Sequence, residues 1–256
     1  MIKTHMFWAY GDFTKLEILC AKSFLKQGFE LTVWTYGDLT NAPNQVAIKD
    51  ARQILSEKEV FLNKRGSYAG FSDLFRYAVL SELGGLYVDT DVLALKNAKY
   101  LPNSPFLVTE RTGTKKNFKN FIRTKLGFTK DNRINGNVLY NPSPIKGDLI
   151  DLAYHYSLRF PKDKVHWSEI GPNLLTAITR IYPEHGYKIF GPEFANDINS
   201  NDCPHMLLKP KVNLKSSSFF LHCYNEKWNR QGFDKNMDYP VDSILYKLEK
   251  DINADF

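Results

Sequence analysis

Two aspartates separated by one residue, Asp89 and Asp91, are the residues of this sequence whose spacing is best suited to chemistry. They directly follow the apolar run Leu86-Tyr87-Val88, which predicts a short buried strand. Because alternate residues of a strand point the same way, both carboxylates can converge just past its end. Such a pair is a hard oxygen site for Mn²⁺ or Mg²⁺, and a metal held there can neutralise a leaving diphosphate. A solvated Asp-x-Asp turn is the alternative interpretation.

The residues before this strand predict a helix that ends beside it. Ser72 is the expected N-cap, and Gly84 follows the last helical residue as a stop. Asp73 and Arg76 are three residues apart and therefore share one face of the helix. They form either a local ion pair or a clamp on sugar hydroxyls and phosphate, because the planar guanidinium binds oxygens in pairs.

The wider pattern predicts one α/β domain with a mixed central sheet. A strand, a helix and a second strand open the chain, and this order implies parallel strands joined by a right-handed crossover. The expected strands are residues 2–8, 29–35, 86–88, 106–109, 135–140 and 219–222, and the expected helices are residues 14–27, 51–64, 72–83, 150–159, 172–181 and 241–248. In open α/β sheets, ligands bind at the carboxyl ends of strands, where the two aspartates lie.

Composition excludes several classes of protein. The chain has 256 residues, of which 43% are apolar and 24% charged, so it is neither disordered, nor collagen-like, nor a disulfide-rich miniprotein. It has no apolar run long enough to predict a membrane-spanning helix and no start typical of a signal peptide. Its three cysteines predict reduced thiols in a cytoplasmic protein, and its net charge of +6 favours anionic partners such as nucleotides.

The run FSDLFRYAVLSELGGLYVDTDVL resembles the signature of GT-A glycosyltransferases of family 32, the group labelled by its DXD sugar-binding region. It is also similar to the core of the clostridial glucosylating toxins. The resemblance implies a single GT-A domain over residues 1–256, with a Rossmann-like mixed sheet flanked by helices. Residues 1–110 would bind the nucleotide sugar, and residues 111–256 would form the acceptor side and the C-terminal metal and diphosphate segment.

The same resemblance implies roles for individual residues. The expected catalytic residues are Asp73, Arg76, Asp89 and Asp91, the expected metal ligands are Asp91, His222 and Asp89, and the expected donor-binding residues are Phe7, Trp8, Tyr10, Tyr87, Asn137 and Trp228. The first three of the donor-binding residues would form the base pocket, and Trp228 would approach the diphosphate. Asn137 is favoured over Asn135 as the sugar contact, although the Asn-Gly dipeptide at 135–136 also fits a tight turn.

The predicted function is that of a retaining glycosyltransferase that uses Mn²⁺ (or Mg²⁺). A UDP-sugar is favoured over GDP-mannose as the donor, and the acceptor is expected to be a glycan or a lipid-linked glycan. The absence of an anchor suggests a cytoplasmic enzyme, peripheral at the inner membrane face, that builds capsule, lipopolysaccharide or a similar surface polysaccharide. The basic segment Arg111–Arg133 fits either a surface helix or contact with an anionic membrane, and no nucleic-acid partner is expected.

Two other functions remain open. Residues 86–93 also match the first motif of haloacid-dehalogenase-like phosphatases, in which the first aspartate is a phosphoryl nucleophile and the second an acid or base. That motif usually opens its fold, whereas a complete strand–helix–strand unit precedes it here. A non-catalytic domain that binds a glycan or a nucleotide is the third possibility.

Overall fold

A seven-stranded sheet forms the centre of the computed structural model, which describes residues 1–110, 133–166 and 168–256. In spatial order the strands are β3 (Ala47–Asp50), β2 (Glu30–Thr35), β1 (Lys3–Phe7), β4 (Gly85–Val88), β7 (Ile134–Asn141), β6 (Phe106–Thr109) and β8 (Lys188–Phe190). Strand β7 pairs antiparallel with both of its neighbours, and the other pairs are parallel. The predicted α/β fold with a mixed central sheet is therefore confirmed.

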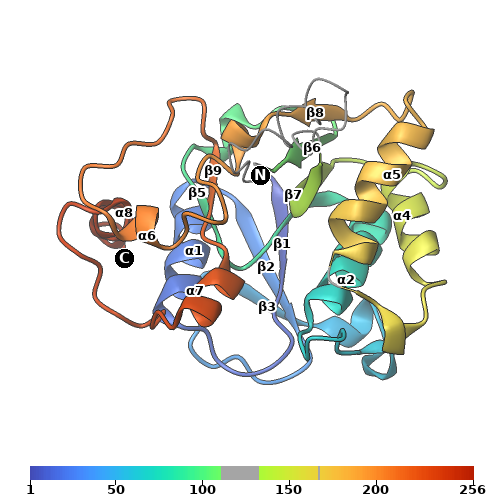
Figure 1. Ribbon diagram of the computed structural model, residues 1–256, viewed down its shortest axis with the longest axis horizontal. Helices are drawn as coiled ribbons and strands as arrows, with labels where there is room; N and C mark the ends of the chain where they lie inside the picture. Colours follow the sequence, from blue (N-terminus) through green and yellow to red (C-terminus); the bar gives the residue numbers. More distant parts are fainter. Residues whose placement is uncertain (111–132, 167) are drawn as a thin grey trace, which may run out of the picture.

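Helices cover both faces of this sheet (Figure 1). One face carries α2 (Ala69–Leu83), α4 (Leu149–Ser157) and α5 (Leu174–Ile181), and the other carries α1 (Lys15–Lys26) with α8 (Ile244–Asn253) packed outside it. Strand β1 contributes apolar side chains to the packing on both faces of the sheet, because its consecutive residues point to opposite faces. Met6 packs in the apolar cluster on the α1 side, and Phe7 packs in the cluster on the α2 side.

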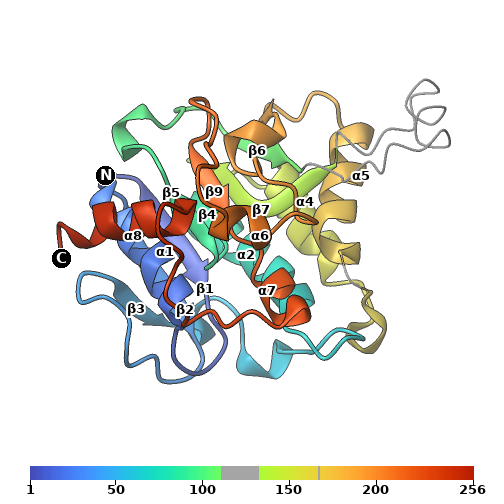
Figure 2. The ribbon, with the colours of Figure 1, turned by 60° about the vertical axis from the view of Figure 1, so that its left-hand side comes forward.

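A second, two-stranded sheet brings a C-terminal segment next to the two aspartates, Asp89 and Asp91. Strand β5 (Val92–Ala94) follows the two aspartates directly and pairs antiparallel with β9 (Phe220–His222). In this register Val92 lies opposite His222. The short helices α6 (His205–Leu208) and α7 (Asn225–Gln231) lie on either side of β9 in the sequence, and Figure 2 shows α7 close to the carboxyl end of β1.

The turn between α2 and β4 depends on glycine. Gly84 and Gly85 have φ angles of +65° and +96°, a region that disfavours residues with a β-carbon. A β-carbon at residue 85 would also lie 2.7 Å from the carbonyl oxygen of Lys3 in the neighbouring strand. These two glycines let the helix return directly into the strand that carries the aspartates.

Several elements differ from the sequence prediction. The helix expected at residues 51–64 is absent, and this part contains two 3₁₀ turns, Ala51–Gln53 and Glu57–Glu59. Side chains cap each turn locally, because Asp50 accepts a hydrogen bond from the backbone of Arg52 and Ser56 accepts one from that of Lys58. Ser72 is not an N-cap, because α2 begins one turn earlier, at Ala69. Strands β3, β5 and β8 were not predicted, and each has only three or four residues.

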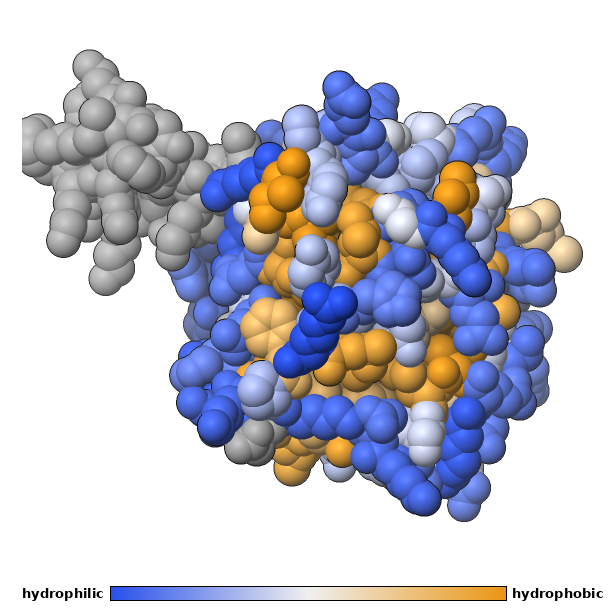
Figure 3. Space-filling view, turned by 90° about the vertical axis from the view of Figure 1, so that its right-hand side faces the viewer, coloured by the Kyte–Doolittle hydropathy of each residue, from blue (hydrophilic) through white to orange (hydrophobic). Residues whose placement is uncertain are grey.

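The face that carries α4 and α5 has an ordinary solvated surface. Tyr156, Leu158, Ile181 and Tyr182 are exposed near the ends of these helices. Figure 3 shows apolar side chains on this side of the molecule that are broken up by hydrophilic ones, which is common on soluble proteins. None of the helices in the described ranges has the length and apolar composition needed to cross a bilayer. The basic segment predicted to contact membrane lies, apart from Arg133, outside the described residues.

Candidate active site

A cavity of about 950 Å³ opens at the carboxyl ends of β1 and β4. These two strands are parallel neighbours, so the residues that follow them meet at one edge of the sheet. Of the residues predicted from the sequence, the cavity lining includes Phe7, Trp8, Tyr10, Asp73, Arg76, Asp89, Asp91 and His222. Its volume suits a ligand larger than a monosaccharide, since small-molecule sites span about 300–1,000 Å³.

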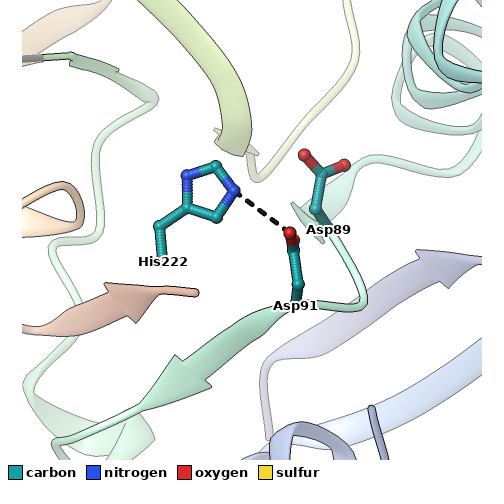
Figure 4. Close-up of side chains that lie close together, drawn as sticks. All are labelled: Asp89, Asp91 and His222. Atoms are coloured by element: carbon teal, nitrogen blue, oxygen red, sulfur yellow. Dashed lines mark ion pairs between the residues drawn. The ribbon is translucent and has the colours of Figure 1, made fainter. Parts of the chain in front are cut away.

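Asp89, Asp91 and His222 converge in this cavity (Figure 4). One potential ligand atom from each lies within 4.8 Å of the others, and Nε2 of His222 is 3.4 Å from Oδ2 of Asp91. Asp89 and Asp91 follow β4 on one chain segment, while His222 arrives from β9 across the β5–β9 pair. The three residues predicted as metal ligands are therefore brought together.

The carboxylate of Asp91 is held by groups that favour its charge. The backbone N–H of Asn225 donates to Oδ2 at 2.6 Å. The backbone N–H of Cys223 donates to the backbone carbonyl of Asp91 at 2.8 Å and so holds the main chain of this residue. Burial alone would raise the pKa of Asp91, but the facing His222, when its ring is charged, and the Asn225 N–H lower it below its usual value. These contacts therefore stabilise the ionised form of the Asp91 carboxylate, although the side chain is buried.

The donor set fits a divalent metal. Two carboxylates and one imidazole nitrogen face a common point, and such a mixed oxygen and nitrogen set suits Mn²⁺ better than Mg²⁺, which prefers oxygen ligands alone. In addition, the buried side-chain oxygen of Asn225, which also lines the cavity, has no hydrogen-bond partner. The residues present can therefore hold the ion that the DXD motif implies.

Arg76 lies next to this cluster and is fixed by several contacts. Its Nη2 is 3.0 Å from Oδ1 of Asp89 and 3.3 Å from Oδ1 of Asp73, and its Nε donates to the Ser72 carbonyl at 3.2 Å. The guanidinium also lies over the ring of Tyr87, at 5.1 Å from the centroid. Burial opposes the charge of Arg76, but Asp89 and Asp73 outweigh it and raise the pKa of the guanidinium. This is a preorganised cation that faces the cavity.

Two glycines make room for the clamp. A β-carbon at Gly136 would lie 2.2 Å from Nη1 of Arg76, and a β-carbon at Gly171 would lie 2.3 Å from Oδ2 of Asp73. From the sequence, Gly171 was noted only as part of the resemblance to the glycosyltransferase family, and Gly136 only as part of a possible turn. The close approach of these backbones to charged side chains is the physical reason for glycine at both positions.

The two carboxylates beside Arg76 are disfavoured as anions by their surroundings. Burial raises the pKa of Asp73 to about 6, although the neighbouring Arg76 acts in the opposite direction. Burial also raises the pKa of Asp89, and the like charge of Asp91 adds to this effect. Carboxylates with strongly shifted pKa values in a cavity are typical of functional sites.

Aromatic side chains also line the cavity, including Trp8, Tyr10 and Tyr68. Tyr10 is exposed, lies 5.8 Å from Tyr68 between ring centroids, and donates its hydroxyl to Glu57 at 2.9 Å. Lys235 lies over the ring of Trp8, at 5.8 Å from the centroid, and forms a 2.8 Å ion pair with the fully buried Glu17. Aromatic faces with a cation nearby are well suited to a nucleobase and its phosphates.

Two of the predicted donor-binding residues, Tyr87 and Trp228, are buried and are not part of the cavity lining. Tyr87 is buried beneath Arg76, and its hydroxyl is 3.2 Å from the hydroxyl of Ser72. Trp228 is fully buried in the C-terminal apolar cluster and donates its Nε1–H to the Cys223 carbonyl at 2.9 Å. These contacts indicate supporting positions, so the expectation of direct contact with the donor is corrected for both.

The preference for Asn137 over Asn135 is reversed. Asn135 lines the cavity and donates its amide to Glu110 at 3.1 Å. Asn137 is fully buried, is not part of the cavity lining, and donates its amide to Asn196 at 3.0 Å. Regular alternation along β7 would place residues 135 and 137 on the same face. The pairing with β6 is irregular here, because the partner on β7 changes from Leu139 to Asn135 between Leu107 and Val108, and this break separates the two asparagines.

Residues 3–109 match the family model described as "Glycosyltransferase sugar-binding region containing DXD motif". This segment runs from β1 to β6 and contains Asp73, Arg76, Asp89 and Asp91. The matched region and the site it carries define the class of the protein, which is a glycosyltransferase with a DXD motif. The match is to the sugar-binding region in general, so membership of family 32 stays a prediction. No curated protein sequence matches the chain.

Solved structures similar to this chain are also glycosyltransferases. PaToxG glycosyltransferase is 17% identical with a TM-score of 0.43, over 71% of this chain and 69% of that chain. Mouse xyloside xylosyltransferase 1 is 14% identical with a TM-score of 0.42, over 89% and 99%. GlyE of Streptococcus pneumoniae TIGR4 is 13% identical with a TM-score of 0.42, over 98% and 64%. The assignment of class is carried by the family match.

Proposed function

We propose that the protein is a metal-dependent retaining glycosyltransferase that moves a sugar from a nucleotide-diphosphate donor to a hydroxyl of a glycan acceptor. The observation that carries this proposal is the convergence of Asp91, Asp89 and His222 beside the Arg76–Asp73 clamp in one cavity. A diphosphate beside the first group would place its sugar beside the second.

The chemistry of each side chain suggests a separate role in binding the metal, the diphosphate or the sugar. Asp91, His222 and Asp89 would hold Mn²⁺ (or Mg²⁺), and the bound ion would neutralise the charge that develops on the departing diphosphate. Arg76 would donate hydrogen bonds to sugar or phosphate oxygens from a fixed position, and Asp73 would accept from a sugar hydroxyl. Because Arg76 already has its contacts in the protein, little reorganisation is required when charge develops.

The other end of the cavity would take the nucleotide base. Trp8 and Tyr10 offer ring faces, and Lys235 and Lys227 also line the cavity and would face the phosphates. A UDP-sugar is the favoured donor through the family resemblance. Residues 1–110 would thus supply the donor side, and the later residues, including His222, would supply the acceptor side and the rest of the metal site.

The biological setting is proposed from the same resemblance. The acceptor would be a glycan or a lipid-linked glycan of a surface polysaccharide such as capsule or lipopolysaccharide, and the enzyme would act in the cytoplasm at the inner membrane face. The three buried free cysteines suit a reducing compartment. Membrane contact through residues 111–133 stays a prediction.

A donor panel tests the proposal. Hydrolysis of UDP- and GDP-sugars is measured with Mn²⁺, with Mg²⁺ and with EDTA, beside a generic phosphatase substrate. We expect metal-dependent release of the nucleotide from one donor. Cleavage of the phosphatase substrate without donor selectivity would favour the phosphatase, and donor binding without turnover even when glycan acceptors are added would favour a binding domain.

A matched pair of variants sharpens this experiment. Asp91→Asn should abolish metal-dependent turnover and keep the fold, because an amide oxygen can still accept from the Asn225 N–H. Asp50→Asn removes an exposed carboxylate on the edge strand β3 and serves as the control. Full activity of Asp91→Asn would contradict the proposed metal site.

A further inference from the structure

We propose that Asn196 is a positioning residue that fixes His222 in the tautomer with its proton on Nδ1, which leaves Nε2 free to bind a divalent metal beside Asp91. This inference rests on the proposed function only for the metal. Asn196 lies just after the 3₁₀ turn Pro192–Phe194, outside the region matched by the family model, and it was not among the residues predicted from the sequence.

The orientation of the Asn196 amide follows from its partners. The side chain is fully buried, and its Nδ2 lies 3.0 Å from the carbonyl oxygen of Thr109. A carbonyl oxygen can only accept, so the NH₂ end of the amide must face Thr109. The opposite orientation would place two oxygens 3.0 Å apart. The Oδ1 end therefore faces the other way, toward His222.

The tautomer of His222 follows in turn. Nδ1 of the ring is 3.1 Å from Oδ1 of Asn196, which cannot donate, so Nδ1 must carry a proton. A neutral imidazole has only one ring proton, and Nε2 is then left with a lone pair. This nitrogen lies 3.4 Å from Oδ2 of Asp91, and two lone-pair atoms that face each other are stabilised by a cation that both can bind.

The surroundings hold both side chains in place. Asn137 donates to Oδ1 of Asn196 at 3.0 Å, and the Tyr224 hydroxyl donates to the same atom at 3.3 Å. The ring of Tyr224 also packs on the ring of His222, with centroids 3.7 Å apart. Metal-binding histidines commonly donate their other ring N–H to an oxygen acceptor, and loss of that acceptor typically costs 10–100-fold in metal affinity or activity.

His5 provides an internal reference, because its contacts dictate the opposite tautomer. The indole N–H of Trp34 donates to Nδ1 of His5 at 3.2 Å, so that nitrogen is an acceptor. Nε2 of His5 must then donate to the Gly84 carbonyl, which is 3.0 Å away. A spectrum that separates the two ring nitrogens should therefore show both tautomers in one protein.

The first test uses the metal-free protein with ¹⁵N-labelled histidine, and the His222→Gln variant identifies the signals of residue 222. We expect the neutral His222 ring to show a protonated Nδ1, as Asn196 requires, and Asn196→Ala to lose this preference. Asn196→Asp keeps an oxygen acceptor toward the ring, with its second oxygen protonated toward the Thr109 carbonyl, and should retain this preference. A neutral His222 ring with its proton on Nε2 in the metal-free wild-type protein would overturn the inference. This readout needs no substrate or turnover.

The second test measures the affinity for Mn²⁺ alone by electron paramagnetic resonance. We expect a loss of about 10–100-fold in Asn196→Ala and near-wild-type affinity in Asn196→Asp. Asn141→Ala is the matched control, because Asn141 is a buried asparagine of β7 that bonds to Asp148, and it should lose stability without losing affinity. Equal affinities in Asn196→Ala and this control would overturn the inference.

These tests separate the inference from the proposed function. A wild-type protein that binds no Mn²⁺ would overturn the metal half of the inference and contradict the proposed function, while the nitrogen signals would still decide the tautomer. If Asn196→Ala fails to fold, the wild-type signals and Asn196→Asp decide instead. A protein that binds Mn²⁺ as expected but cleaves no nucleotide sugar would contradict the proposed function alone.

Discussion

Gly136 lies so close to Arg76 that a β-carbon at this position would be 2.2 Å from Nη1 of the guanidinium. Arg76 can occupy its place between Asp73 and Asp89 only because residue 136 has no side chain. The strand that carries Gly136 therefore sets the position of a cation that belongs to the neighbouring helix.

The Gly136→Ala variant tests this relationship. The added methyl group should displace the Arg76 side chain, and we expect kcat for donor cleavage to fall by about 100-fold, as small misplacements of catalytic groups can cost that much. The melting temperature should change far less than in a core variant. Steady-state kinetics and thermal unfolding check the two parts. Wild-type kcat would show that the position of Arg76 is not needed for turnover.

Asp73→Asn should make the protein more stable above pH 6. The folded-state pKa of Asp73 is raised from 3.8 to about 6, so its stabilising contribution is complete below about pH 4 and is lost as the pH rises through 6. A difference of this size corresponds to about 3 kcal/mol in the free energy of unfolding. The free energy of unfolding of Asp73→Asn should therefore exceed that of the wild type by an amount that grows from pH 4 to pH 7, as measured by denaturant unfolding. An equal difference at both pH values would contradict the raised pKa.

The same variant should lose activity. Asp73 pairs with Arg76 and lines the cavity, and an amide cannot compensate the guanidinium charge. Donor cleavage by Asp73→Asn is expected to be weak at every pH at which the wild type works. A variant that is both more stable and less active would identify this carboxylate as a residue retained for function.

His5 predicts the opposite dependence on pH. Burial lowers its pKa from 6.5 to about 4, so the unfolded chain binds the proton more readily, and stability is complete above pH 6.5 and is lost as the pH falls toward 4. In His5→Gln an amide can accept from Trp34 and donate to the Gly84 carbonyl. As the pH falls from 6.5 to 4, the free energy of unfolding of the wild type should decrease relative to that of His5→Gln, as measured by denaturant unfolding. A constant difference would contradict the lowered pKa.

Trp228→Phe and Trp8→Phe should separate packing from donor binding. Trp228 is fully buried and donates to the Cys223 carbonyl, so its replacement should lower the free energy of unfolding by about 1–3 kcal/mol and leave KM for the donor nearly unchanged. Trp8 lines the cavity, so its replacement should raise KM with little loss of stability. Kinetics and urea unfolding of both variants check this. A raised KM with little loss of stability in Trp228→Phe would instead support the direct donor contact first expected for Trp228.

Local patterns made the central part of the site predictable. Asp73, Arg76, Asp89 and Asp91 follow helix and strand periodicities within one continuous segment, so their proximity can be inferred from spacing. His222 was found through the resemblance, because nothing in its own neighbourhood indicates a partner at Asp91.

Long-range polar contacts could not be predicted in this way. Asn196 and Asn225 act through hydrogen bonds to residues far away in the sequence, and the local sequence around an asparagine gives no sign of such partners. Trp228 shows the converse problem, because an aromatic residue near a binding site can equally belong to the core. The helix expected at residues 51–64 was wrong because local side-chain caps at Asp50 and Ser56 favour short turns over a continuous helix.

The pairing of β5 with β9 makes the metal site a property of the whole chain. Asp91 and Asn225 are 134 residues apart in the sequence, and both aspartates lie in the matched region whereas His222 does not. A fragment limited to residues 3–109 would carry the sugar clamp with an incomplete metal site. The two functions are also separable in evolution, since a change confined to the three residues of β9 could alter metal preference while the sugar contacts on α2 stay intact.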